Sequence, residues 1–138
     1  MGKYPASLIH DKYSEWHYNH LMAINYEKYK YLGLADIDNL IYKPEVEGYR
    51  LWIEHDFKKP LAAMDLKWEG GIDSITKGEV IIYNWLEDKK LPCYIVFITF
   101  DFLEFRIKRW ITSVERKLNE IEYADWLLSL RYYNYSGL

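Results

Sequence analysis

The sequence predicts an α/β domain in which helices flank a mixed sheet, with elements in the order helix, three-stranded meander, helix, strand. Three observations predict this order. Two short segments with the residue pattern of strands come before an apolar run at residues 61–64. A segment of helical length separates that run from a longer apolar run at residues 93–100. A strand, a helix and a second strand imply a right-handed crossover, so the two apolar strands are expected to be parallel.

The N-terminal half of the chain is expected to supply the first helix and the meander. We predict a helix at residues 8–22 with Asp11 as its N-cap, followed by a connection or a helix extension at 23–31. The expected meander consists of strands at about 34–42 and 49–54, a hairpin loop at 43–48, a turn at 57–60 and a third strand that carries Asp65 and Lys67.

The C-terminal half is expected to supply the crossover and an extension of the sheet. Asp73 or Ser74 caps a helix that runs to about Lys90, and Pro92 stops it. The apolar run at 93–100 is predicted to be a buried strand. The remaining elements are an edge strand or β-ribbon around 103–108 and a last helix around 121–131.

Charged residues end the third predicted strand, directly after its apolar run. Side chains alternate along a strand, so Asp65 and Lys67 share one face, as do Asp36 and Asp38 on the first strand. If these two strands are neighbours with these ends aligned, three carboxylates and one ammonium converge. Burying such charges costs several kcal/mol per ion unless they are paired or bound to metal. The pattern therefore predicts a site for a hard divalent cation such as Mg²⁺.

Composition excludes several other classes of protein. Half of the 138 residues are hydrophobic, which indicates one folded domain rather than a disordered chain. No apolar run has the length of a bilayer span and no signal peptide is seen, so an intracellular protein without a membrane anchor is expected, in the host cytoplasm if it is viral. The net charge of −3 disfavours strong nonspecific binding to nucleic acid. Cys93 is expected to be a buried, unreactive thiol.

In the order of its elements, and in Asp38, Asp65 and Lys67, the chain resembles the PD-(D/E)xK nuclease superfamily. Asp36 is a rival for the place of Asp38, and Glu15 matches the helical glutamate of some members. More narrowly, residues 13–17, 36–38 and 59–67 resemble a group of poorly characterised nuclease-like proteins of microbes and their viruses. The likeness covers about residues 11–100 of the single expected domain and leaves 101–138 as an extension.

The resemblance implies a restriction-endonuclease-like core and hydrolysis of DNA phosphodiesters with Mg²⁺ or Mn²⁺. In that interpretation Asp65 and either Asp38 or Asp36 bind the metal, and the carbonyl group of Leu66 completes the site. Lys67 orients or helps to deprotonate the attacking water, and Glu15 binds a second metal or its water shell. The sequence departs from the superfamily pattern in three places, the first of which is Asp65 where glutamate is the commoner residue. No proline precedes the first aspartate, and Glu79-x-x-x-Tyr83 stands where some relatives have Gln-x-x-x-Tyr.

Two further groups of side chains are weaker candidates. His17 and His20, spaced i, i+3 on a helix, suit zinc but are only two ligands, so surface or packing roles are the alternative. The basic residues Arg106, Lys108 and Arg109 could contact a DNA backbone, and a solvated strand face is the alternative for them.

Two hypotheses for the function follow. The first is a metal-dependent DNA nuclease, endo- or exonucleolytic, for which a homodimer is reasonable if both strands are cut. The second is a catalytically inactive nuclease-like domain that binds nucleic acid or another protein.

Overall fold

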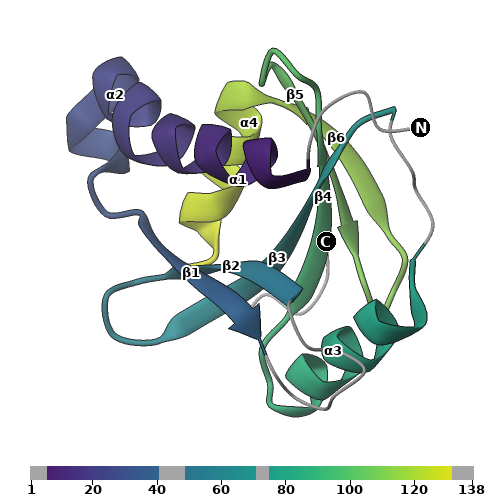
Figure 1. The fold of residues 1–138 in the computed structure, drawn as a ribbon. Helices are drawn as coiled ribbons and strands as arrows, with labels where there is room; N and C mark the ends of the chain where they lie inside the picture. Colours follow the sequence, from purple (N-terminus) through teal and green to yellow (C-terminus); the bar gives the residue numbers. More distant parts are fainter. Residues whose placement is uncertain (1–5, 41–48, 71–74, 132–138) are drawn as a thin grey trace.

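A mixed sheet of six strands forms the centre of the fold (Figure 1). The computed structural model describes residues 6–40, 49–70 and 75–131. The strands are β1 (Gly33–Leu40), β2 (Tyr49–His55), β3 (Pro60–Trp68), β4 (Cys93–Ile98), β5 (Glu104–Arg109) and β6 (Glu115–Asn119), and they lie in the sheet in chain order. Neighbouring strands are antiparallel except β3 and β4, which are parallel. The predicted crossover and the predicted mixed sheet are confirmed.

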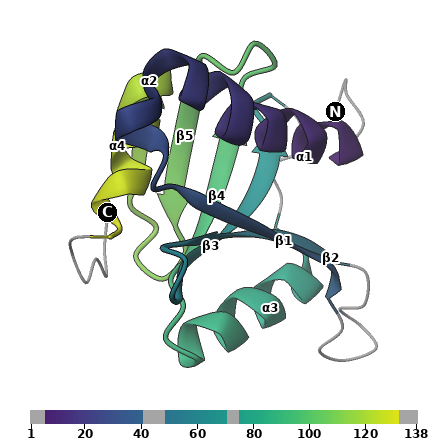
Figure 2. The same cartoon turned by 90° about the vertical axis from the view of Figure 1, so that its left-hand side faces the viewer.

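Helices cover both faces of this sheet (Figure 2). On one face lie α1 (Ala6–Glu15), the π-helical turn η1 (Trp16–His20), α2 (Leu21–Tyr29) and α4 (Glu120–Ser129). On the other face lies α3 (Lys77–Asp88). No helix in the described part of the chain has both the length and the apolar character needed to cross a membrane.

Alternation along β3 divides the core into two clusters. Met64 and Leu66 pack with the aromatic residues of α1, η1 and α4 on one face. Ala63 packs with Ile82 and Tyr83 of α3 on the other face. Because Asp65 and Lys67 have the same parity as Ala63, both belong to the face that α3 covers.

Short local motifs cap the N-termini of α3 and α4. Thr76 and Glu79 form a capping box at the start of α3, and Asn119 and Glu122 form another at the start of α4. The predicted caps of α3, Asp73 and Ser74, lie outside the described residues, and the helix begins at Lys77 instead.

Two other elements differ from the predictions. The first helix begins at Ala6 rather than at an Asp11 cap, because Ile9 and Tyr13 pack into the core from its first turns. The helix continues through η1 into α2 as far as Tyr29, with non-helical backbone at Asn25, so the alternative of a helix extension at 23–31 is confirmed. The strand β6 was not predicted, since Leu118 is its one buried side chain. The predicted hairpin loop at 43–48 lies outside the described residues.

Candidate active site

Four side chains from β3 and α3 meet on the face of the sheet that α3 covers. We call Asp65, Lys67, Glu79 and Tyr83 the carboxylate–lysine cluster. Lys67 Nζ lies 2.8 Å from Glu79 Oε2 and 3.8 Å from Asp65 Oδ2. The hydroxyl group of Tyr83 donates a hydrogen bond to Asp65 Oδ2. The side chains of Asp65 and Lys67 are 12% and 17% exposed, so the cluster is largely enclosed but solvent reaches it.

The capping box of α3 orients the glutamate of this cluster. The backbone N–H of Thr76 donates to Glu79 Oε1 at 2.9 Å, which leaves Oε2 directed at Lys67. Tyr83 follows Glu79 by four residues, so both side chains lie on the same side of the helix. The local sequence that starts the helix therefore also places a carboxylate and a phenol over the end of β3.

The two carboxyl groups of the cluster have opposite pKa shifts. Burial, and to a smaller extent the neighbouring Glu79, raise the pKa of Asp65 to about 7 against the attraction of Lys67 and the hydrogen bond from Tyr83. Burial also opposes ionisation of Glu79, but hydrogen bonds from Lys67 and the Thr76 backbone outweigh it and hold its pKa below the usual value. Glu79 therefore ionises more readily than Asp65, and the proton of the pair resides on Asp65. Burial and the Asp65 carboxylate raise the pKa of Tyr83, which keeps it a hydrogen-bond donor.

The cluster contains two carboxyl groups that could act as ligands of a divalent cation. Mg²⁺ takes oxygen ligands and is usually held by one or two protein carboxylates together with water and substrate phosphate. Asp65 and Glu79 supply two adjacent carboxylates, and Lys67 alone does not hold both in the ionised state. A divalent cation would add the missing positive charge. Among the residues that the structure describes, no group of three or more His, Cys, Asp or Glu side chains gathers as a metal site.

Asp36 and Asp38 lie on β1, which is not a neighbour of β3. The strand β2 lies between β1 and β3. The arrangement that would bring three carboxylates together on adjacent strands is therefore not found. Asp36 pairs with Trp52, and Trp52 pairs with Met64, which aligns Asp36 with a residue of the sheet face opposite to that of Asp65. The side chains of Asp36 and Asp38 lie outside the part of the chain that the structure describes.

Glu15 is not part of the carboxylate–lysine cluster. It lines a cavity of about 270 Å³ with Trp16, His20 and Phe102 on the opposite face of the sheet. The side chain of Leu66 is buried on that face too, and its backbone lies in register with Val96 of β4. The structure therefore brings Asp65 and Lys67 together and separates Glu15 from them.

Only some of the basic side chains predicted to contact DNA from β5 are accessible at the surface. Arg109 is 2% exposed and its guanidinium group pairs with Glu87, so its side chain is not part of an exposed basic face. Arg106 and Lys108 lie on the same sheet face as Lys67, because they pair with Phe97 and Ile95 of β4. Arg106 donates two hydrogen bonds of 2.9 Å to Glu69 and stacks 3.9 Å above the ring of Phe97.

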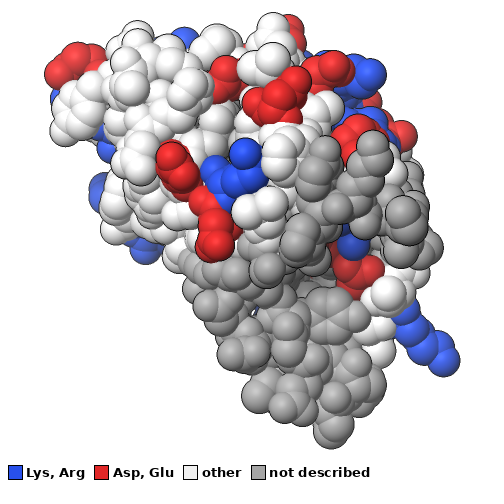
Figure 3. Space-filling view, turned by 45° about the horizontal axis from the view of Figure 1, so that its top comes forward, with Lys and Arg blue, Asp and Glu red and all other residues white. Residues whose placement is uncertain are grey.

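Charge on the molecular surface is mixed. On the face drawn in Figure 3, acidic and basic side chains of the described residues lie interspersed among broader uncharged areas. Such a distribution suits local contacts with a charged partner better than a continuous electrostatic track.

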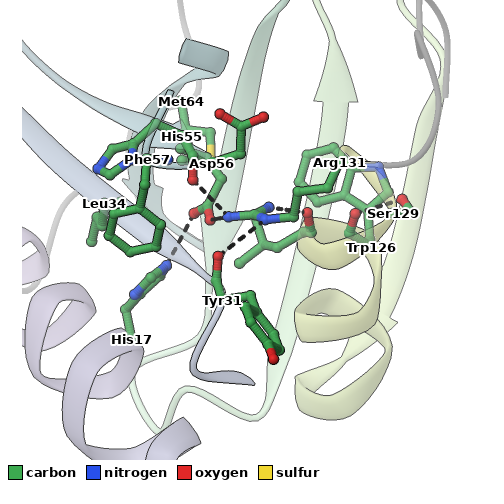
Figure 4. A network of polar contacts seen from close by, with 12 residues as sticks. His17, Tyr31, Leu34, His55, Asp56, Phe57, Met64, Trp126, Ser129 and Arg131 are labelled. Carbon is green, nitrogen blue, oxygen red and sulfur yellow. Dashed lines mark hydrogen bonds and ion pairs between the residues drawn. The ribbon is translucent and has the colours of Figure 1, made fainter. Parts of the chain in front are cut away.

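The two histidines proposed for zinc do not share a site. His20 Nε2 lies 2.6 Å from Glu120 at the surface, whereas His17 is fully buried and lies 3.0 Å from Glu54 Oε1. Arg131 pairs with the other oxygen of Glu54 and donates to the carbonyl groups of His55 and Tyr31 (Figure 4). This buried network connects η1, β2 and the residue that follows α4. Its role is therefore to hold these elements together.

Glu79 and Tyr83 are the two residues of the cluster to which the sequence prediction gave no role. Their i, i+4 spacing at the start of a helix that follows Asp-x-Lys was the available signal. Cys93, by contrast, is buried as predicted, and burial raises the pKa of its thiol far above the usual value.

No protein-family model, no curated protein and no solved structure matches this chain. A statement about its chemistry therefore depends on the geometry of the described residues.

Proposed function

We propose that this chain is a divalent-cation-dependent nuclease that hydrolyses DNA phosphodiester bonds at the carboxyl end of β3. The observation that supports this best is the position of Lys67, whose ammonium group lies between the carboxylates of Asp65 and Glu79 at a solvent-accessible end of a buried strand. Paired charges of this kind with shifted pKa values are concentrated at catalytic sites.

The order of the elements also supports the proposal. A helix, an antiparallel meander of three strands, a crossover helix and a parallel strand follow one another here. The PD-(D/E)xK resemblance implied this order, with Asp-x-Lys on the third strand. Asp65 and Lys67 occupy that place on β3.

Each residue of the cluster has a distinct role in the proposed reaction. Asp65 and Glu79 would hold Mg²⁺ or Mn²⁺, and the bound ion would offset negative charge on the phosphodiester and acidify a water molecule. Lys67 orients the attacking water and stabilises the additional charge on the phosphate. Tyr83 fixes the carboxyl group of Asp65 by its hydrogen bond.

Cleavage of linear, circular and branched DNA, with Mg²⁺, Mn²⁺ or a chelator, tests the proposal. Asp65→Asn and Lys67→Ala are expected to lower the rate by about 100-fold or more, since charge-stabilising groups contribute on this scale. Asp125→Asn and Lys28→Ala are matched controls, because these residues form a 2.8 Å ion pair on the opposite face of the sheet. Both controls should cut DNA like the wild type.

Two results would contradict the proposal. One is wild-type protein that cuts none of the substrates with either metal, and the other is folded cluster variants that cut as fast as the wild type. Wild-type protein that binds DNA without cutting it would favour the second hypothesis, a nucleic-acid-binding module.

A further inference from the structure

The hairpin between β2 and β3 presents an unusual aromatic side chain. Phe57 is 67% exposed, more than any other large hydrophobic residue that the structure describes. Its backbone has φ +67°, a left-handed conformation that bulky residues rarely adopt. Both exposure and conformation disfavour phenylalanine here, and such strain is concentrated at ligand-binding positions.

Local hydrogen bonds hold this hairpin in a defined shape. Asp56 Oδ1 accepts hydrogen bonds from the backbone N–H groups of Lys58 and Lys59 at 3.0 and 2.9 Å. The N–H of Phe57 donates to His55 Nδ1 at 3.1 Å, and the two rings meet edge to face with centroids 5.0 Å apart. The exposed ring is therefore presented by an ordered turn.

A groove of about 470 Å³ lies beside the ring. Its walls are residues 57–60 together with Ala35, Ile53 and His55. The floor is apolar, and the side chains of Lys58 and Lys59 are exposed at its rim. A flat aromatic ring beside an apolar groove with two cations matches the chemistry of a nucleotide, since a base stacks on the ring and its phosphate attracts the ammonium groups.

We propose that this hairpin binds one unpaired nucleotide of single-stranded DNA, with the base stacked on Phe57 and the neighbouring phosphates paired with Lys58 and Lys59. The proposal rests on the proposed nuclease function and names an unpaired strand as the substrate region. Charge complementarity favours this occupant over a protein segment, because both rim side chains are cationic.

The position of the groove agrees with that role. Ile53 packs with α3, so the groove opens on the sheet face that carries the carboxylate–lysine cluster. Pro60 and Asp65 are five positions apart on β3, which corresponds to roughly 17 Å. In Figure 1 the hairpin lies at the lower left and α3 at the lower right.

Binding of a short fluorescent oligothymidylate to the full chain, with a chelator to prevent cutting, tests the inference. Phe57→Ala is expected to weaken binding by about tenfold, as removal of a stacking platform does. The double variant Lys58→Ala/Lys59→Ala should lower the slope of log affinity against log salt by about 1.4, since each phosphate contact on a single strand contributes about 0.7. The matched controls are Tyr26→Ala, an aromatic residue 59% exposed on α2, and Lys89→Ala at the end of α3.

Four results would overturn the inference. These are wild-type protein that does not bind the oligonucleotide, Phe57→Ala that binds it equally well, an equal loss of affinity for blunt duplex, and a change of oligomeric state in Phe57→Ala. The last would make the groove an interface between copies of the chain. Metal-dependent cleavage without binding at the hairpin overturns only this inference, whereas hairpin binding without cleavage overturns only the nuclease proposal.

Discussion

The hydroxyl group of Tyr83 donates a hydrogen bond to Asp65, and this contact joins α3 to the end of β3. Lys67 makes a second connection between the same elements through Glu79. The ionisation of Asp65 therefore depends on two partners that stand one helical turn apart on α3, and each partner acts on it in a different direction.

Substitution of these two partners is expected to move the pKa of Asp65 in opposite directions. Tyr83→Phe removes a hydrogen bond that favours the carboxylate, so the Asp65 pKa should rise above about 7. Glu79→Gln removes a neighbouring negative charge, so the pKa should fall. Titration of the Asp65 carboxyl carbon by NMR measures both shifts. Shifts of the same sign in both variants would show that the side chains do not act on Asp65 as the geometry requires.

The stability of the protein should fall as the pH rises toward neutrality. The carboxyl group of Asp65 has a pKa of about 7 in the folded chain and about 4 when unfolded, so the folded state binds the extra proton between these values. The free energy of unfolding therefore decreases with pH across this window and levels off above it, by roughly 4 kcal/mol at most. Glu79 has the opposite effect at acidic pH. Because its pKa is lowered in the folded chain, its protonation there decreases the free energy of unfolding.

Urea denaturation from about pH 5 to pH 8 checks this dependence, and Asp65→Asn should flatten the curve because asparagine does not titrate. Mg²⁺ should restore stability at the upper end of the range, since a ligand that binds only the folded state stabilises it. A wild-type curve that is flat, or one that Asp65→Asn leaves unchanged, would contradict the assignment.

The sequence could predict those parts of the fold that depend on local patterns. The apolar runs of β3 and β4 and the helical segment between them imply the parallel pair, and alternation alone puts Asp65 and Lys67 on one face. Contacts between distant segments could not be predicted in this way. The strand β6 shows one buried residue, Leu118, and becomes a strand only because β5 offers an edge to pair with.

The same limit applies to only part of the candidate site. The meander predicted from the sequence already implied that β2 separates β1 from β3, and the structure has this order, so the sequence itself argued against a contact of Asp36 and Asp38 with Asp65. Glu79 joins the cluster because Thr76 starts the helix at the position that aims its carboxylate at Lys67, and the predicted caps would have shifted that register. The buried pairing of Glu54 with Arg131 joins residues 77 positions apart and has no local signal.

The buried network around Glu54 gives a prediction about stability. Arg131→Met leaves the fully buried carboxylate of Glu54 without its guanidinium partner and should cost about 3–5 kcal/mol of unfolding free energy. Arg106→Met is the matched control, because its partners Glu69 and Glu115 are partly exposed and the loss should be about 1 kcal/mol or less. Chemical denaturation of both variants measures the difference, and equal losses would show that the Glu54 network is no more important than a surface ion pair.

The variant Phe57→Gly distinguishes the effect of backbone strain at position 57 from the proposed stacking of a base on the Phe57 ring. Glycine adopts positive φ without a steric penalty, so this variant should be more stable than Phe57→Ala by about 1 kcal/mol, because alanine keeps the strained backbone. Both variants lose the ring, and both should bind single-stranded oligonucleotide about tenfold more weakly than the wild type. Thermal unfolding and fluorescence anisotropy measure the two quantities on the same samples. A glycine variant that gains stability and keeps its affinity would mean that the strained phenylalanine serves some purpose other than stacking on a base.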